Sequence, residues 1–175
     1  MRIDQKHGAR QIQALFLVLL LICLLRQFRE QLGTGARLLI GMDRVKPVDR
    51  LLAAYDDPQG VTAKFNLNLL ERINRELGAD VPVHWFKHRA VWNDTWSRIE
   101  MHLVATRDLS FMIAGRHFEM HADETIHTEN SHKYTPRSGR QLLAAGGWTP
   151  LREWSDANQM FSLILAEARP EPVAP

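Results

Sequence analysis

The segment HTENSHKY, residues 127–134, gathers an unusual density of hydrogen-bonding side chains. Glu129 and Ser131 are two residues apart, so in an extended chain their side chains point to the same side. A carboxylate and a hydroxyl placed in this way can bind the two nitrogens of one heteroaromatic ring, and the charged carboxylate favours a ring that presents an N–H. Alternatively, Thr128 and Ser131 cap a helix or a turn. Spacing alone leaves both interpretations open.

Four histidines lie close together in the same region, at His117, His121, His127 and His132. The stretch HFEMH superficially resembles a zinc-binding pair, but the helical zinc motif has a glutamate directly after its first histidine, where this chain has Phe118. In a strand, two histidines four residues apart share a face but are too far apart to bind one ion without help. We therefore expect no metal ligands here, and histidines on a solvated sheet face.

A second polar cluster is the stretch AAYDDPQG, residues 53–60, in which Tyr55 precedes Asp56 and Asp57. Asp-Asp-Pro-Gln-Gly has the composition of an exposed turn, so the residues themselves favour a loop of no special function. The alternative is that Tyr55 donates its hydroxyl to the carboxylate of a ligand.

The N-terminal region contains the apolar run ALFLVLLLICLL, residues 14–25, after the basic residues Arg2, Lys6 and Arg10. This is how a secretory signal or a membrane anchor begins, but about twelve apolar residues are too few to span a bilayer comfortably. Apolar residues continue at helical spacing as far as Gly33. The pattern favours one buried amphipathic helix that ends at Gly33, and a membrane-associated segment at 14–25 is the alternative.

Further elements follow from local patterns. The apolar stretch at 36–43 predicts a strand that is buried on both faces. A helix is expected at 61–77, between Gly60 and Gly78. Its apolar side chains recur every four residues and form the expected buried face: Phe65, Leu69, Ile73 and Leu77. The asparagines between them are expected to face elsewhere.

The second half of the chain begins with alternating residues that predict an antiparallel meander over 97–129. One strand of it has an apolar face with Ile99, Met101 and Leu103 and a polar face with Arg98, Glu100 and His102. Thr135 and Pro136 predict the start of a helix that ends at Gly146. Strands are expected at 149–154 and 160–167, before a loose tail at 168–175.

Bulk composition narrows the function classes. The chain has 175 residues, a net charge of +2 and basic residues that are scattered rather than clustered, so we expect no nucleic-acid partner. Its single cysteine, Cys23, excludes an internal disulfide and is consistent with a cytoplasmic location. The order of elements predicts an α/β sheet interrupted by a smaller α+β subdomain.

Several long motifs, in order, resemble one family. They are AAYDDPQGVTAKFNLNLLERINRELGAD, HRAVWN, RIEMHLVATRD, ETIHTENSHKYT and GGWTPLREWSDANQMFSLILAE. From about residue 27 to 167, the chain is similar to the C-terminal half of the histidine-specific Nα-methyltransferases of ergothioneine biosynthesis. The resemblance implies an α/β fold with part of a class I (Rossmann-like) methyltransferase sheet at 27–50 and 135–167. It also implies an inserted α+β substrate-binding subdomain at 51–134, and it leaves 1–26 unmatched.

The same resemblance implies an activity and a site. The family transfers a methyl group in line from S-adenosylmethionine to the neutral α-amine of L-histidine. Tyr55 matches the family tyrosine that holds the substrate carboxylate. Glu129 and Ser131 match the pair that binds the imidazole, and Met101 matches the methionine that lines the ring pocket. The polar segment that contains Glu129 and Ser131 is thus expected to bind a histidine side chain, and no separate catalytic residue is expected.

The resemblance also predicts what this chain needs from elsewhere. The family's glycine-rich first strand, its acidic ribose ligand and its substrate-orienting asparagine have no match in this sequence. We therefore expect a truncated or frameshifted coding sequence, whose chain binds no cofactor alone. The alternatives are a noncatalytic remnant or histidine-binding module, a chain that supplies this half to a separately encoded N-terminal half, and a membrane-tethered protein.

Overall fold

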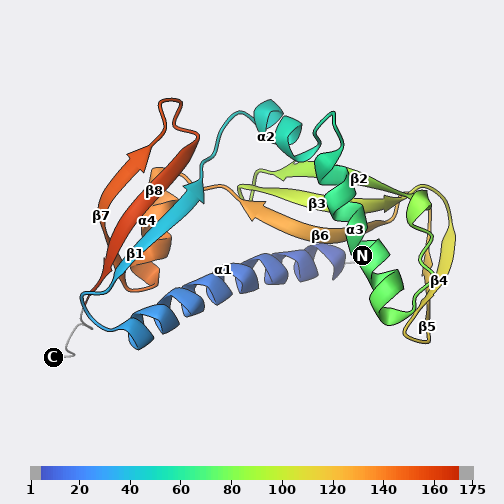
Figure 1. Ribbon diagram of the computed structural model, residues 1–175, viewed down its shortest axis with the longest axis horizontal. Helices are drawn as coiled ribbons and strands as arrows, with labels where there is room; N and C mark the ends of the chain where they lie inside the picture. The colour runs from blue at the N-terminus through green and yellow to red at the C-terminus, as the bar shows by residue number, and fades with distance from the viewer. Residues whose placement is uncertain (1–4, 170–175) are drawn as a thin grey trace. The chain divides into compact units, whose positions relative to one another are not determined.

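The computed structural model describes residues 5–169, with side chains from residue 18 onward (Figure 1). The basic leader residue Arg2 and the proline-rich end from Pro170 lie outside the described residues, as do the side chains of 14–17. The described chain divides into two compact units. One contains the residues up to Val45 together with those from Lys133 onward, and the other is Lys46–His132.

The first unit is a small antiparallel sheet with two helices. Its elements are α1 (Gln5–Leu32), β1 (Arg37–Asp43), α4 (Pro136–Ala145), β7 (Trp148–Ser155) and β8 (Phe161–Ala168). The strand order is β1-β8-β7, and β8 pairs antiparallel with both neighbours. The core lies on one face of this sheet, where α4 and Leu25 of α1 pack against Met42, Trp148 and Ile164. The indole N–H of Trp148 donates to the Leu25 carbonyl at 2.8 Å and so links β7 to α1.

The second unit has two helices over a three-stranded sheet and a separate hairpin. Its elements are α2 (Val48–Tyr55), α3 (Val61–Leu77), the 3-10 turn η1 (Val83–Trp85), β2 (Phe86–Asn93), β3 (Arg98–Ala105), β4 (Leu109–Ile113), β5 (Arg116–Met120) and β6 (Thr125–His132). The main sheet has the order β2-β3-β6, and β4-β5 forms the hairpin. The protein is therefore a mixed α/β fold with small antiparallel sheets.

Most of the predicted boundaries are confirmed because they depend on local capping chemistry. The helix α3 begins after Gly60 and ends before Gly78, both with positive φ. Thr135 caps α4 through a reciprocal pair of hydrogen bonds with Ser138, and Pro136 is the first helical residue. Both C-terminal strands are also present. The antiparallel meander predicted over 97–129 is only partly correct: β3 pairs with β6, and β4 and β5 form a separate hairpin between them in the chain.

The buried face predicted for α3 is wrong except at Ile73, which packs against the core of this unit. Phe65 is 66% exposed, whereas Asn66 is only 3% exposed and packs with Leu70 against the rest of the unit. The asparagines on this face have strong partners: Asn74 exchanges two 2.8 Å hydrogen bonds with the main chain of Val81. Apolar spacing located the helix but not the face that packs, since the packed face is held partly by amide hydrogen bonds.

The prediction that the strand at 36–43 is buried on both faces is also wrong. Among the described strands, β1 pairs with β8 alone, so it lies at the edge of its sheet. Leu38 and Ile40 pack toward the core, but Leu39 on the opposite face is 57% exposed. An uninterrupted apolar strand is expected where both faces are covered, and the described residues cover only one.

The N-terminal helix ends at Gly33 as predicted, where φ is +81° and the glycine N–H donates to the Arg29 carbonyl at 2.9 Å. The prediction that this helix is buried is wrong for the side chains that are described. Leu25 is buried, but Phe28 is 41% exposed and Leu24 is similar, because the helix packs on α4 along a narrow stripe. In the described part of the chain, no helix combines the length and apolar character needed to cross a membrane.

Candidate functional site

The polar segment that contains Glu129 and Ser131 forms strand β6, which pairs antiparallel with β3. The register shifts once: Glu129 lies opposite Met101, whereas His127 lies opposite His102. Thr128 is therefore the additional residue of a β-bulge, and its hydroxyl donates to the Met101 carbonyl at 3.0 Å. Since Met101 and His102 point to opposite faces of β3, the bulge places Glu129 and His127 on opposite faces of the sheet.

Glu129 and Ser131 share one face. Ser131 lies opposite Ile99 and Glu129 lies opposite Met101, and these two β3 residues are on the same side of the sheet. Met101 is buried beneath this position, whereas Glu129 is exposed. The strand thus presents a carboxylate and a hydroxyl side by side above a thioether. Neither Thr128 nor Ser131 makes a helix cap, because their hydroxyls contact the Met101 carbonyl and Tyr55.

Tyr55 reaches the same face from α2. Its hydroxyl lies 2.6 Å from the Ser131 hydroxyl, although the two residues are 76 positions apart in the chain. The structure therefore brings the four residues singled out by the sequence into two contacting pairs, Tyr55 with Ser131 and Met101 with Glu129. The direct contact between Tyr55 and Ser131 was not predicted from the spacing of these residues.

The turn that follows Tyr55 has a structural role that the sequence interpretation missed. The Asp57 carboxylate accepts hydrogen bonds from the backbone N–H groups of Thr62 at 2.8 Å and Val61 at 2.9 Å. These bonds, with that from Thr62 the largest cause, lower the pKa of Asp57 from 3.8 to about 2. Asp57 thus satisfies two of the N–H groups that the first turn of α3 leaves without helical partners.

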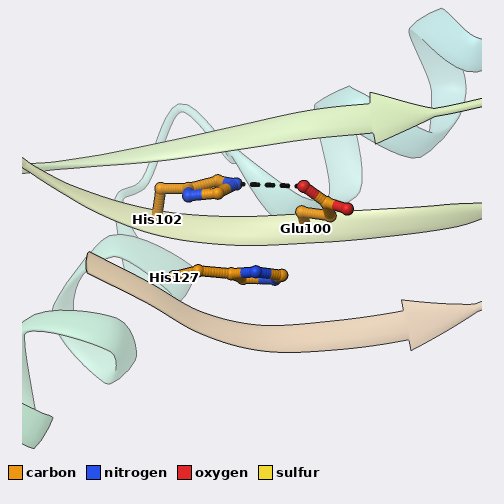
Figure 2. Close-up of side chains that lie close together, drawn as sticks. All are labelled: Glu100, His102 and His127. Atoms are coloured by element: carbon orange, nitrogen blue, oxygen red, sulfur yellow. Dashed lines mark hydrogen bonds and ion pairs between the residues drawn. The ribbon is translucent and has the colours of Figure 1, made fainter. Parts of the chain in front are cut away.

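The opposite face of the same sheet carries a second polar cluster, shown in Figure 2. Glu100 and His102 project from β3 and His127 from β6, and the His102 and His127 rings stack with centroids 4.6 Å apart. Glu100 lies 3.3 Å from His102 through its second oxygen, while its first oxygen accepts hydrogen bonds from Arg98 at 2.6 Å and from Asn93 at 2.8 Å.

One potential ligand atom from each of Glu100, His102 and His127 lies within 4.8 Å of the others, a spacing that suits a metal ion. The charges oppose this use. Burial alone would raise the pKa of Glu100, but the hydrogen bonds from Arg98 and Asn93 outweigh it and hold the pKa low. The resulting carboxylate is already neutralised by the adjacent Arg98 guanidinium, so a divalent cation would meet a positive group. Burial lowers the pKa of His102 and keeps its ring neutral. We interpret the cluster as structural: the Arg98–Glu100 ion pair lies within β3, the Asn93 hydrogen bond to Glu100 joins β3 to β2, and the stacked rings of His102 and His127 join β3 to β6.

Comparison with known proteins identifies the family. Residues 21–168 match the model of a family described as histidine-specific, S-adenosylmethionine-dependent methyltransferases. The chain belongs to this family. The resemblance noted from the sequence motifs is thereby confirmed, and the match includes the whole β2-β3-β6 sheet as well as β1, β7 and β8.

Named relatives agree. The chain is 44% identical over 134 residues to the Histidine N-alpha-methyltransferase of Mycobacterium tuberculosis, which covers 75% of this chain and 42% of the relative. The protein of the same name from Mycolicibacterium smegmatis is 41% identical over 139 residues, 78% of this chain and 43% of the relative. Ergothioneine biosynthesis protein 1 of Neurospora crassa is 29% identical over 148 residues, 83% of this chain and 16% of the relative. The chain thus spans less than half the length of these relatives.

Proposed function

We propose that this chain supplies the histidine-binding part of an S-adenosylmethionine-dependent methyltransferase that acts on the α-amine of L-histidine in ergothioneine biosynthesis. Membership of the histidine-specific family supports the reaction class and the substrate. The observation that carries the assignment of the site is the shared face of Glu129 and Ser131 on β6, with the Tyr55 hydroxyl in contact with Ser131.

In this proposal the imidazole lies over Met101. The Glu129 carboxylate accepts the ring N–H, and the Ser131 hydroxyl bonds the second ring nitrogen. The buried Met101 thioether provides an apolar and polarisable floor. A neutral imidazole has one donor nitrogen and one acceptor nitrogen, so a carboxylate paired with a hydroxyl matches both.

Tyr55 is assigned to the substrate carboxylate. Its hydroxyl has one proton to donate, and in this structure the group lies 2.6 Å from Ser131. When a carboxylate binds, the Tyr55 proton turns to the charged acceptor, and the single Ser131 proton is directed to the second ring nitrogen. Binding at both ends fixes the α-amine between them, which is the orientation that a methyl transfer to nitrogen requires.

The described residues do not form a binding site for S-adenosylmethionine. A cofactor-binding glycine turn lies between a strand and the helix that follows it. After β1 the chain continues as Arg44, Val45, Lys46 and Pro47. The nearby glycines lie elsewhere: Gly33 and Gly35 precede the strand, and Gly41 lies within it. We therefore assign S-adenosylmethionine to the complementary part of the enzyme and no step of cofactor chemistry to this chain.

The exposed side of the β1-β8-β7 sheet supports the proposal that a complementary half binds there. The register aligns a row of apolar side chains on this face, each at least 38% exposed: Leu39, Trp154, Phe161 and Leu163. The outer edge of β1 has no partner among the described strands. An apolar face beside an open strand edge favours association. We infer that these three strands form the edge of a class I methyltransferase sheet, which a complementary part of the enzyme completes in the cytoplasm.

The proposal is tested by complementation. The chain is co-expressed with the N-terminal part of the Mycobacterium tuberculosis relative, and histidine binding is measured by calorimetry and methyl transfer by mass spectrometry of the product. We expect histidine binding that Glu129→Gln weakens at least tenfold, while the matched change Glu119→Gln on the exposed hairpin has no effect. Unaltered affinity in Glu129→Gln would contradict the site. Binding without methyl transfer would reduce the function to that of a histidine-binding module.

A further inference from the structure

A chain of hydrogen bonds leads from the interior of the second unit to Tyr55. The Asn66 amide on α3 donates to Nδ1 of His88 on β2 at 2.9 Å. Nε2 of His88 then donates to the main-chain carbonyl of Tyr55 at 2.8 Å. Through its side chain, Tyr55 meets Ser131 at 2.6 Å. These hydrogen bonds thus connect four elements one after another, from α3 to β2, from β2 to α2 and from α2 to β6.

The direction of each bond is fixed by chemistry. A carbonyl oxygen only accepts, so Nε2 of His88 carries the proton in its bond to Tyr55. In the neutral ring Nδ1 then has a lone pair, and it accepts from the Asn66 NH2 group, which only donates. His88 is therefore the neutral Nε2–H tautomer. The opposite tautomer would break both bonds.

The Asn66 side-chain amide has two N–H groups, one for each of two acceptors. The second is directed to the main-chain carbonyl of His102 at 3.2 Å. The residue is buried, so the loss of either donor leaves an acceptor unsatisfied without access to water. Aspartate has the same shape but no donor, and leucine has the volume without the polarity.

The carbonyl that His88 holds is that of the last residue of α2. The final carbonyls of a helix have no helical partner, so the end of a short helix readily shifts unless another group binds it. His88 binds Tyr55 at the main chain while Ser131 contacts it at the hydroxyl. Both ends of the tyrosine are thereby fixed relative to the sheet.

We propose that Asn66 and His88 are positioning residues for the histidine site, which hold the Tyr55 hydroxyl beside Ser131 at the place from which it binds the substrate carboxylate. The inference rests on the proposed function. Its consequence is specificity: with the Tyr55 proton directed to the substrate carboxylate, the Ser131 proton points to the unprotonated ring nitrogen while Glu129 takes the ring N–H. A ring with a methyl group on either nitrogen cannot satisfy both residues, so ring-methylated histidines are expected to be rejected.

The test combines calorimetry with nitrogen NMR on the complemented chain. We expect Asn66→Asp and His88→Phe to weaken histidine binding about tenfold, the equivalent of one good hydrogen bond. The same variants should lose part of the discrimination against ring-methylated histidine. His88→Gln retains a donor at the Nε2 position and an acceptor for Asn66, so it should restore affinity to within about threefold. The control is His121→Phe at an exposed position, which should change nothing.

The NMR spectrum of histidine-labelled protein should show His88 as the neutral Nε2–H tautomer, and Asn66→Asp should alter that signal specifically. A fold defect in His88→Phe would be recognised from its spectrum, and Asn66→Asp, which preserves shape, then decides the matter. Suppose that the wild type binds histidine, and that the Asn66→Asp and His88→Gln variants bind it with equal affinity and unchanged discrimination against ring-methylated histidine. This result would overturn the positioning role and leave the proposed function intact. Absence of histidine binding in the wild type would overturn both.

Discussion

Replacement of Asp43 by asparagine is expected to destabilise the protein more than replacement of its cationic partner. Lys133 follows β6, and its side chain is completely buried, with its ammonium 2.9 Å from the Asp43 carboxylate at the end of β1. Asp43 itself is 30% exposed. The two members of this ion pair therefore differ in what remains after the other is removed, because water can reach the carboxylate but not the ammonium.

The magnitude follows from this asymmetry. Asp43→Asn leaves a buried charge opposite a neutral amide, which is expected to cost about 3 kcal/mol in the free energy of unfolding. Lys133→Met removes the buried charge, fills similar volume and leaves a carboxylate in contact with water, so the expected cost is about 1 kcal/mol or less. For a chain of this length, Asp43→Asn should lower Tm by about 6–12 °C, and Lys133→Met should lower it by at most about 4 °C.

Urea unfolding followed by circular dichroism, with the complementary half present, measures both values. A matched control is Glu167→Gln, which breaks the exposed ion pair with Arg37 and should change stability by less than about 1 kcal/mol. If Asp43→Asn and Lys133→Met cost the same, or if Lys133→Met costs more, the argument that the buried ammonium dominates is refuted.

Three further perturbations test local features of the fold. Backbone hydrogen bonds, chiefly from Thr62, depress the pKa of Asp57 to about 2, so its stabilisation is present above about pH 4 and is lost as the pH falls toward 2. Asp57→Asn should flatten this part of an acid-unfolding curve, and an unchanged slope would contradict the capping role. Gly147→Ala should cost more than about 1 kcal/mol in urea unfolding, because φ is +82° and the new Cβ would lie 2.6 Å from Cδ of Arg29. Thr135→Ala should cost about 1 kcal/mol by loss of the α4 cap, and Thr135→Ser, which keeps the hydroxyl, should cost much less.

The features that could be predicted are those that a few neighbouring residues decide. Glycine at Gly33, Gly60 and Gly78 adopts positive φ, and the chain ends or begins a helix there regardless of what packs nearby. The helix α2 escaped prediction because it has only eight residues and no side-chain cap. The packed face of α3 could not be predicted from apolar spacing, because hydrogen bonds from the side-chain amides of Asn66 and Asn74 help to decide which face packs.

The candidate site shows the same division. The shared face of Glu129 and Ser131 follows from the period of two in a strand, and the register agrees with it. The contact between Tyr55 and Ser131 joins residues far apart in the chain, and nothing local specifies it. His88 gave no signal either, since a single histidine in a strand has many possible roles until its two partners are known.

The bulge at Thr128 explains how so polar a segment serves two purposes. Without the additional residue, His127 would lie on the face of Glu129 and Ser131, because side chains two apart in a regular strand share a side. With it, His127 stacks on His102 beside the Arg98–Glu100 ion pair, while Glu129 and Ser131 face Met101 and Tyr55. One strand can then contribute a ring to the cluster that holds the sheet together and also present a carboxylate and a hydroxyl to a ligand. Deletion of Thr128 should therefore break one of these two sets of contacts, because only one half of β6 could then keep its present register with β3.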